Sequence, residues 1–135
     1  MLDTNIFIYW VLDYESLSRD VQAILSDYDN SFYLSSESVK ELIVGFDNGK
    51  LVAKHWKTAS EMINTIREKF FIRILPVGED HMDTYAHLTL NEDHKDPSDH
   101  VIISHAITNR MPLISSDRHF HFYCKQGLEL IFNHK

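Results

Sequence analysis

Apolar residues recur along this chain at two kinds of spacing, one typical of helices and one typical of short buried strands. The clearest helical segment is His55–Phe70, in which apolar side chains recur every three or four positions. Short apolar runs such as Phe71–Leu75, which Pro76 ends, predict strands. We expect helices over Ile6–Leu12, Ser18–Tyr28, Ser36–Phe46, His55–Phe70, Glu79–Leu90 and Ser98–Asn109. We expect strands over Ser31–Ser35, Phe71–Leu75, Pro112–Ser116 and Leu128–Phe132.

The predicted strands and helices alternate along the chain, and Met1–Asp3 adds the end of a further strand at the start. Thr4 or Asn5 is expected to cap the helix that follows this strand. Alternation of this kind requires crossover connections between parallel strands, with helices on both faces of the sheet. We therefore expect one α/β domain over residues 1–135, with a central parallel sheet.

The amino-acid composition says less about the function of the chain than the apolar pattern says about its fold. The chain has 135 residues, of which 44% are hydrophobic and 24% charged, as in globular domains. A net charge of −7 argues against a general nucleic-acid coat, but a metal bound among acids reverses the local sign of the charge. The single cysteine, Cys124, excludes an internal disulfide. We see no secretory leader and no apolar run near the ~20 residues that span a membrane, so we expect a cytoplasmic protein without membrane contact.

Four carboxylates occupy special places in this layout. Asp3 and Asp117 each end a predicted strand, Asp99 lies in the first turn of its helix, and Glu41 lies about one turn into its helix. Strand ends and the helix starts that follow them share one edge of a parallel sheet, where ligand sites form. Convergent carboxylates repel one another unless a cation lies between them, and Mg²⁺ and Mn²⁺ prefer oxygen ligands. Each acid alone is more often a cap or a surface charge, so spacing does not decide between these interpretations.

Four blocks of sequence carry a resemblance to a known family. They are Leu2–Ile6, Ser35–Leu42, His94–Ala106 and Pro112–Asp117. In order, spacing and total length they resemble the PIN-domain family, and within it the VapC-like toxins of bacterial toxin–antitoxin pairs. The resemblance implies an α/β/α sandwich and cleavage of RNA phosphodiesters that depends on Mg²⁺ or Mn²⁺. Carried over by position, the family's catalytic and metal-binding acids fall on Asp3, Glu41, Asp99 and Asp117.

The same resemblance suggests supporting residues and shows two departures. We expect Asp96, Asn5 and Ser116 to support the four acids from the next layer of contacts. His100 stands where the toxins usually have an arginine, so any contact of that arginine with a carboxylate or a phosphate would here need a protonated histidine. Ser115 stands where a threonine is common and keeps the hydroxyl group.

Nine histidines raise the question of a zinc site. His94 and His100 flank the acidic motif, and His119 and His121 alternate shortly after the last acid. Structural zinc sites use nitrogen and sulfur ligands at defined spacing, and Cys124 is alone. We therefore expect histidines on the surface or on helix faces, with His119 or His121 as a candidate RNA contact.

Three hypotheses for function remain open. The first is an endoribonuclease toxin, for which the resemblance implies an RNA substrate such as tRNA or rRNA, an antitoxin laid across the active edge, and a homodimer. The second is a PIN-like module that has lost its chemistry and binds proteins; the four retained acids argue against it. The third is a flavodoxin-like or receiver-like module phosphorylated on an aspartate, which leaves Glu41 unexplained and lacks the expected paired acids and downstream lysine.

Overall fold

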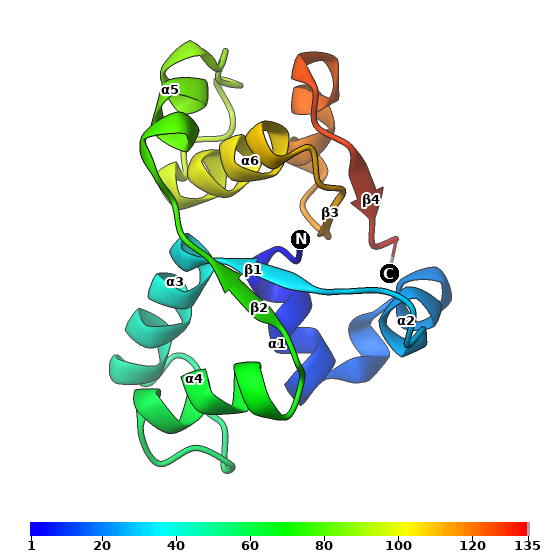
Figure 1. Cartoon of the computed structure of the whole chain (residues 1–135), viewed down its shortest axis with the longest axis vertical. Helices are drawn as coiled ribbons and strands as arrows, with labels where there is room; N and C mark the ends of the chain where they lie inside the picture. The colour runs from blue at the N-terminus through cyan, green and yellow to red at the C-terminus, as the bar shows by residue number, and fades with distance from the viewer. Residues whose placement is uncertain (135) are drawn as a thin grey trace.

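The amino-terminal segment lies in the middle of a parallel sheet in the computed structural model, which describes residues 1–134 (Figure 1). Leu2 forms a parallel bridge with Ile114, and its N–H donates to the carbonyl of Tyr33 at 2.9 Å. Met1–Asp3 therefore joins two parallel pairs of strands. These are β1 (Tyr33–Ser35) with β2 (Arg73–Leu75), and β3 (Leu113–Ser115) with β4 (Leu130–Phe132).

Alternate side chains of the strands separate into two hydrophobic cores, as the pleat of a strand requires. Leu2, Leu34 and Ile114 belong to one core, whereas Met1 and Leu113 belong to the other. The first core is closed by helices α1 (Thr4–Leu12), α2 (Arg19–Ser26), α3 (Ser36–Asp47) and α4 (Ala59–Glu68). The second is closed by α6 (Pro97–Asn109) and the 3₁₀ helix η2 (Arg118–Gln126), and α5 (Glu79–His87) packs on α6.

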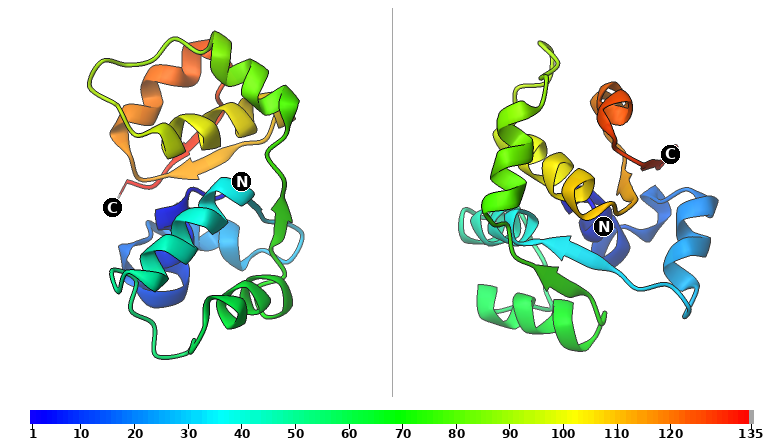
Figure 2. Two further views of the ribbon diagram at one scale, coloured as in Figure 1. Left: turned by 90° about the vertical axis from the view of Figure 1, so that its left-hand side faces the viewer. Right: turned by 45° about the horizontal axis from the view of Figure 1, so that its top comes forward.

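Helices thus cover both faces of the sheet, and Figure 2 shows the two groups on opposite sides of the strands. The predicted α/β/α sandwich with a central parallel sheet is confirmed. A short 3₁₀ turn, η1 (Tyr14–Ser16), connects α1 to α2. None of the helices within residues 1–134 has the length and apolar character needed to cross a membrane.

Several element boundaries differ from the sequence-based expectation. Helix α4 begins at Ala59 and not at His55, because the Thr58 hydroxyl caps it by accepting the N–H of Glu61 at 3.1 Å. Helix α5 ends at His87, three residues earlier than predicted. The helix η2 was not predicted, because a 3₁₀ helix has three residues per turn and does not produce the spacing of an α-helix.

The cap of α1 is also different from the prediction, and this correction concerns the site. The N-cap is Asp3, not Thr4 or Asn5, and its Oδ1 accepts the N–H of Thr4 at 2.8 Å. Asp117 caps η2 and Asp96 caps α6, each by accepting the backbone N–H of the residue two positions further on. Three helices on the carboxyl edge of the sheet therefore begin with an aspartate.

Candidate metal centre

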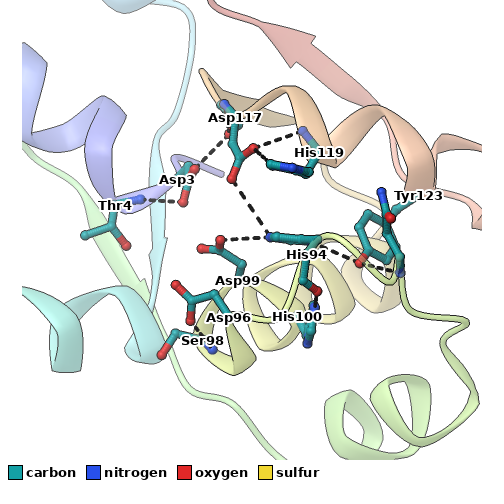
Figure 3. A network of polar contacts seen from close by, with 12 residues as sticks. Asp3, Thr4, His94, Asp96, Ser98, Asp99, His100, Asp117, His119 and Tyr123 are labelled. Carbon is teal, nitrogen blue, oxygen red and sulfur yellow. Dashed lines mark hydrogen bonds and ion pairs between the residues drawn. The ribbon is translucent and has the colours of Figure 1, made fainter.

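Three of the four acids singled out in the sequence, Asp3, Asp99 and Asp117, lie close together around the first turn of α6 (Figure 3). Asp3 and Glu41 each interact electrostatically with Asp99, and so does Asp117. Asp3 ends the central segment Met1–Asp3, and Asp117 follows β3. Glu41 lies in α3, the helix that follows β1. The cluster therefore lies at the carboxyl edge of the strands, where the layout predicted it.

Asp3 is the most deeply placed of these acids, with 5% of its surface exposed. Its Oδ2 accepts the hydroxyl of Ser115 at 2.7 Å and its Oδ1 accepts the N–H of Thr4. Burial raises the pKa of Asp3 to about 7, with smaller contributions from Asp99 and Glu41, although the two hydrogen bonds oppose the rise. Asp3 is therefore about half protonated at neutral pH unless a cation compensates its charge.

Asp99 behaves in the same way although it is more accessible. Its pKa is raised to about 7, first by burial and then by repulsion from Asp96, Glu41 and Asp117. The pKa of Glu41 is also raised, first by burial, while the Thr4 hydroxyl that donates to its Oε1 at 2.6 Å lowers it. A cluster in which several acids resist ionisation is an environment that a divalent cation would relieve.

Two overlapping groups of side chains offer ligand atoms within 4.8 Å of one another. One group contains only oxygen donors, from Glu41, Asp96 and Asp99; the other consists of His94, Asp99 and Asp117. Asp99 belongs to both groups. Oxygen-rich sets of this kind fit Mg²⁺ or Mn²⁺, so the residues present suit the cation that the sequence suggested.

His94 was wrongly expected on the surface. It lies in the loop between α5 and α6 with 4% of its side chain exposed, and its Nε2 lies 2.9 Å from Oδ2 of Asp99 and 3.9 Å from Oδ2 of Asp117. Its Nδ1 lies 3.0 Å from the hydroxyl of Tyr123 in η2. Burial lowers the pKa of His94, and the charge of Asp117 opposes that effect. The available signal was its place two residues before Asp96, in the same block of sequence.

His100 does not take over the role of the arginine that it replaces. It is 2% exposed, its Nε2 lies 2.7 Å from the carbonyl oxygen of His94, and its Nδ1 has no hydrogen-bond partner among residues 1–134. Its hydrogen-bond partner is thus a backbone carbonyl and not a carboxylate, and it is not a solvated surface histidine either. His100 instead fixes the backbone of the residue that does contact the acids.

The remaining histidines divide between surface and interior. His81 in α5 and His105 in α6 lie on helix faces, as one of the two expectations had it, and are buried against each other with ring centroids 4.1 Å apart. His119 is half-exposed; its Nδ1 lies 2.8 Å from Oδ1 of Asp117, and its ring stacks on that of His94. Of the two candidate RNA contacts, His119 is thus the one beside the acids.

Two of the three expected supporting residues are replaced by their neighbours. Asn5 is exposed and its side chain makes no hydrogen bond within residues 1–134, whereas Thr4 contacts two of the acids. The Ser116 hydroxyl accepts from Asn133 at 2.8 Å, whereas Ser115 donates to one acid and accepts the backbone N–H of another. The third, Asp96, is an exposed cap that also offers an oxygen to the first ligand group.

Comparison with known families adds a match to the PIN domain over residues 1–125. The chain belongs to the PIN-domain family. PIN domains are generally metal-dependent nucleases, which agrees with an acidic cluster that suits a divalent cation.

Two solved PIN-type structures resemble the whole fold. VapBC2 from Rickettsia felis, bound to a DNA fragment from its promoter, is 19% identical with a TM-score of 0.67, over 98% of this chain and 97% of that one. FitAcB from Neisseria gonorrhoeae is 20% identical with a TM-score of 0.68, over 98% of this chain and 95% of that one. At this identity the likeness establishes the fold. Comparison with curated proteins gives no significant match.

Proposed function

We propose that residues 1–135 form one PIN nuclease domain, a metal-dependent endoribonuclease that is the toxin of a type II toxin–antitoxin pair. The observation that carries the proposal is the convergence of Asp3, Glu41, Asp99 and Asp117 at one edge of the sheet, with the pKa of two of them raised to about 7. A structural role would not require several acids to share a place where their charges repel.

The four acids would together hold Mg²⁺ or Mn²⁺. A bound ion of this kind lowers the pKa of a water molecule and neutralises charge on a phosphodiester. The chain supplies the orientation: Ser115 and the Thr4 N–H fix the two oxygens of Asp3, and the Thr4 hydroxyl fixes Glu41. Asp117, with 32% of its side chain exposed, marks the side from which a phosphate of RNA can approach.

Cleavage of a labelled RNA panel that includes tRNA and rRNA fragments tests the proposal. We expect cleavage with Mn²⁺ or Mg²⁺ and none with EDTA. Asp99→Asn should reduce the rate at least about a hundredfold, the upper end of what loss of a residue that only supports a metal ligand costs. The matched control is Asp93→Asn, an exposed acid six residues earlier and outside both ligand groups, which should cleave like the wild type.

A wild-type protein that binds Mn²⁺ yet leaves every RNA intact would overturn the nuclease proposal and favour the protein-binding module. Equal rates of RNA cleavage for Asp99→Asn and the wild type would show that Asp99 is not part of the catalytic centre. Both outcomes are read on a folded protein, because Asp99 is partly exposed, with 17% of its side chain accessible, and belongs to neither hydrophobic core.

An antitoxin is the proposed partner, because the sequence resembles the VapC-like toxins and one similar structure is VapBC2 from Rickettsia felis, bound to a DNA fragment from its promoter. We propose a homodimer in the cytoplasm, as the family resemblance implies. Co-expression with the product of the adjacent reading frame should yield a stable complex and suppress RNA cleavage. Light scattering on the purified protein should give twice the mass of 15.8 kDa.

A further inference from the structure

We infer that His94 is itself a metal ligand, so that the centre offers a position with a nitrogen donor beside its all-oxygen position and selects Mn²⁺ over Mg²⁺. The nitrogen position consists of His94, Asp99 and Asp117, and the oxygen position of Glu41, Asp96 and Asp99. The inference rests on the proposed function only in requiring a divalent metal at this edge of the sheet.

The spacing of the donors suits an octahedral ion. With bonds of ~2.1 Å, adjacent ligands of such an ion lie about 3 Å apart and opposite ligands about 4.2 Å apart. Nε2 of His94 lies 2.9 Å from Oδ2 of Asp99, which matches adjacent ligands, and 3.9 Å from Oδ2 of Asp117, which falls between the two values. An ion can therefore take the place of the hydrogen between His94 and Asp99 with little movement.

His94 is also held in place as metal-binding histidines usually are. Such histidines donate their second ring N–H to a fixed acceptor. The Tyr123 oxygen lies 3.0 Å from Nδ1, and because it accepts only the backbone N–H of Asn91 at 3.2 Å it has a lone pair left for Nδ1–H. The backbone of His94 is fixed at both ends, by Asn91 at its N–H and by His100 at its carbonyl.

The donor type carries the expected selectivity. Mg²⁺ prefers oxygen ligands and retains its waters, whereas imidazole binds first-row transition metals and strengthens their binding over Mg²⁺. A centre made only of carboxylates would distinguish Mn²⁺ from Mg²⁺ less. The nitrogen of His94 should therefore set the ratio of the two affinities.

Pulsed electron paramagnetic resonance on the Mn²⁺-loaded protein tests the inference directly. Modulation from a coordinated ¹⁴N should appear in the wild type and change to the ¹⁵N pattern when the histidines are ¹⁵N-labelled. His94→Gln, which keeps an N–H donor for Asp99, should remove it. His119→Gln is the matched control, because His119 also contacts Asp117 but lies outside both ligand groups, and the signal should persist.

Calorimetric titration gives the second readout. His94→Gln should weaken Mn²⁺ binding about tenfold or more and leave Mg²⁺ binding nearly unchanged. If His94→Gln fails to fold, the labelled wild type together with His119→Gln still decides, because a ¹⁴N signal that survives in His119→Gln assigns it to the other histidine at the acids.

Absence of any ¹⁴N coupling, or a His94→Gln variant that loses Mn²⁺ and Mg²⁺ affinity equally, would overturn the inference and leave His94 as a hydrogen-bond partner of Asp99. RNA cleavage with Mn²⁺ but without ¹⁴N coupling would overturn only the inference that His94 is a metal ligand. A ¹⁴N signal without RNA cleavage would sink only the nuclease proposal.

Discussion

Asp3→Asn should make the metal-free protein more stable at alkaline pH and less stable at acidic pH. Asp3 is nearly inaccessible to solvent, and burial raises its pKa from 3.8 to about 7. Because the pKa in the folded state is higher than in the unfolded state, the folded protein binds more protons between these values. The free energy of unfolding therefore falls as the pH rises from about 4 through 7.

The magnitude follows from the same values. One pKa unit corresponds to about 1.4 kcal/mol, so ionised Asp3 destabilises the metal-free fold by roughly 4 kcal/mol above pH 7. Asparagine has no charge to bury and still offers an oxygen to the Thr4 N–H, but it deprives the Ser115 hydroxyl of its acceptor, at about 1 kcal/mol. We expect Asp3→Asn to be about 2–3 kcal/mol more stable than the wild type at pH 8 and about 1 kcal/mol less stable at pH 4.

Urea denaturation in EDTA at half-unit steps from pH 4 to 8.5 measures this difference. Asp29→Asn, an exposed acid in the loop before β1, is the control and should follow the wild type throughout. Curves for Asp3→Asn and the wild type that stay parallel over the whole range would refute the reasoning, because burial of the Asp3 charge would then contribute nothing to folding.

Three further predictions concern the metal and two hydrogen bonds. Mn²⁺ at a hundred times its dissociation constant should stabilise the protein by about 2.7 kcal/mol, and the apparent affinity should rise with pH as Asp3 and Asp99 lose their protons, as a thermal-shift titration would show. Asp96→Ala should lower the free energy of unfolding by about 1 kcal/mol through the lost α6 cap, whereas Asp96→Asn should keep the cap and lose metal affinity, so equal stability losses would contradict the cap. Ser35→Ala should cost about 1–3 kcal/mol in urea denaturation, because the buried Ser35 hydroxyl is the partner of His105 Nδ1 and also caps α3 by accepting the N–H of Glu37; an unchanged midpoint would contradict both bonds.

The positions of three of the four acids could be predicted because they follow from local patterns. A strand followed by a helix places its junction at the carboxyl edge of a parallel sheet, whatever the remaining contacts are. Asp3 and Asp117 lie at such junctions, and Glu41 lies in the helix that follows another. Asp99 lies in the first turn of α6, which follows α5 and a loop, so its place came from the family resemblance and not from this rule. The family resemblance then distinguished these four acids from the other acids of the chain.

The histidine at the centre could not be predicted in the same way. His94 is placed by Tyr123, which lies 29 residues away in η2, and by His100 six residues away. The loop before α6 shows no periodicity that would indicate burial, and η2 was not predicted from the sequence. Contacts between irregular segments depend on the completed tertiary structure, so the sequence showed the acids but not the side chain that they surround.

Placement of Met1–Asp3 in the middle of the sheet has a consequence for synthesis on the ribosome. This segment is synthesised before the elements on either side of it in the sheet, yet Asp3 is fixed by Ser115, 112 positions further along the chain. Contacts over such separations form late, because most of the chain must be ordered before they stabilise it. A nascent chain therefore carries Asp3 unpaired while the residues up to Ser115 are made, and the centre is complete only after Asp117 has been added.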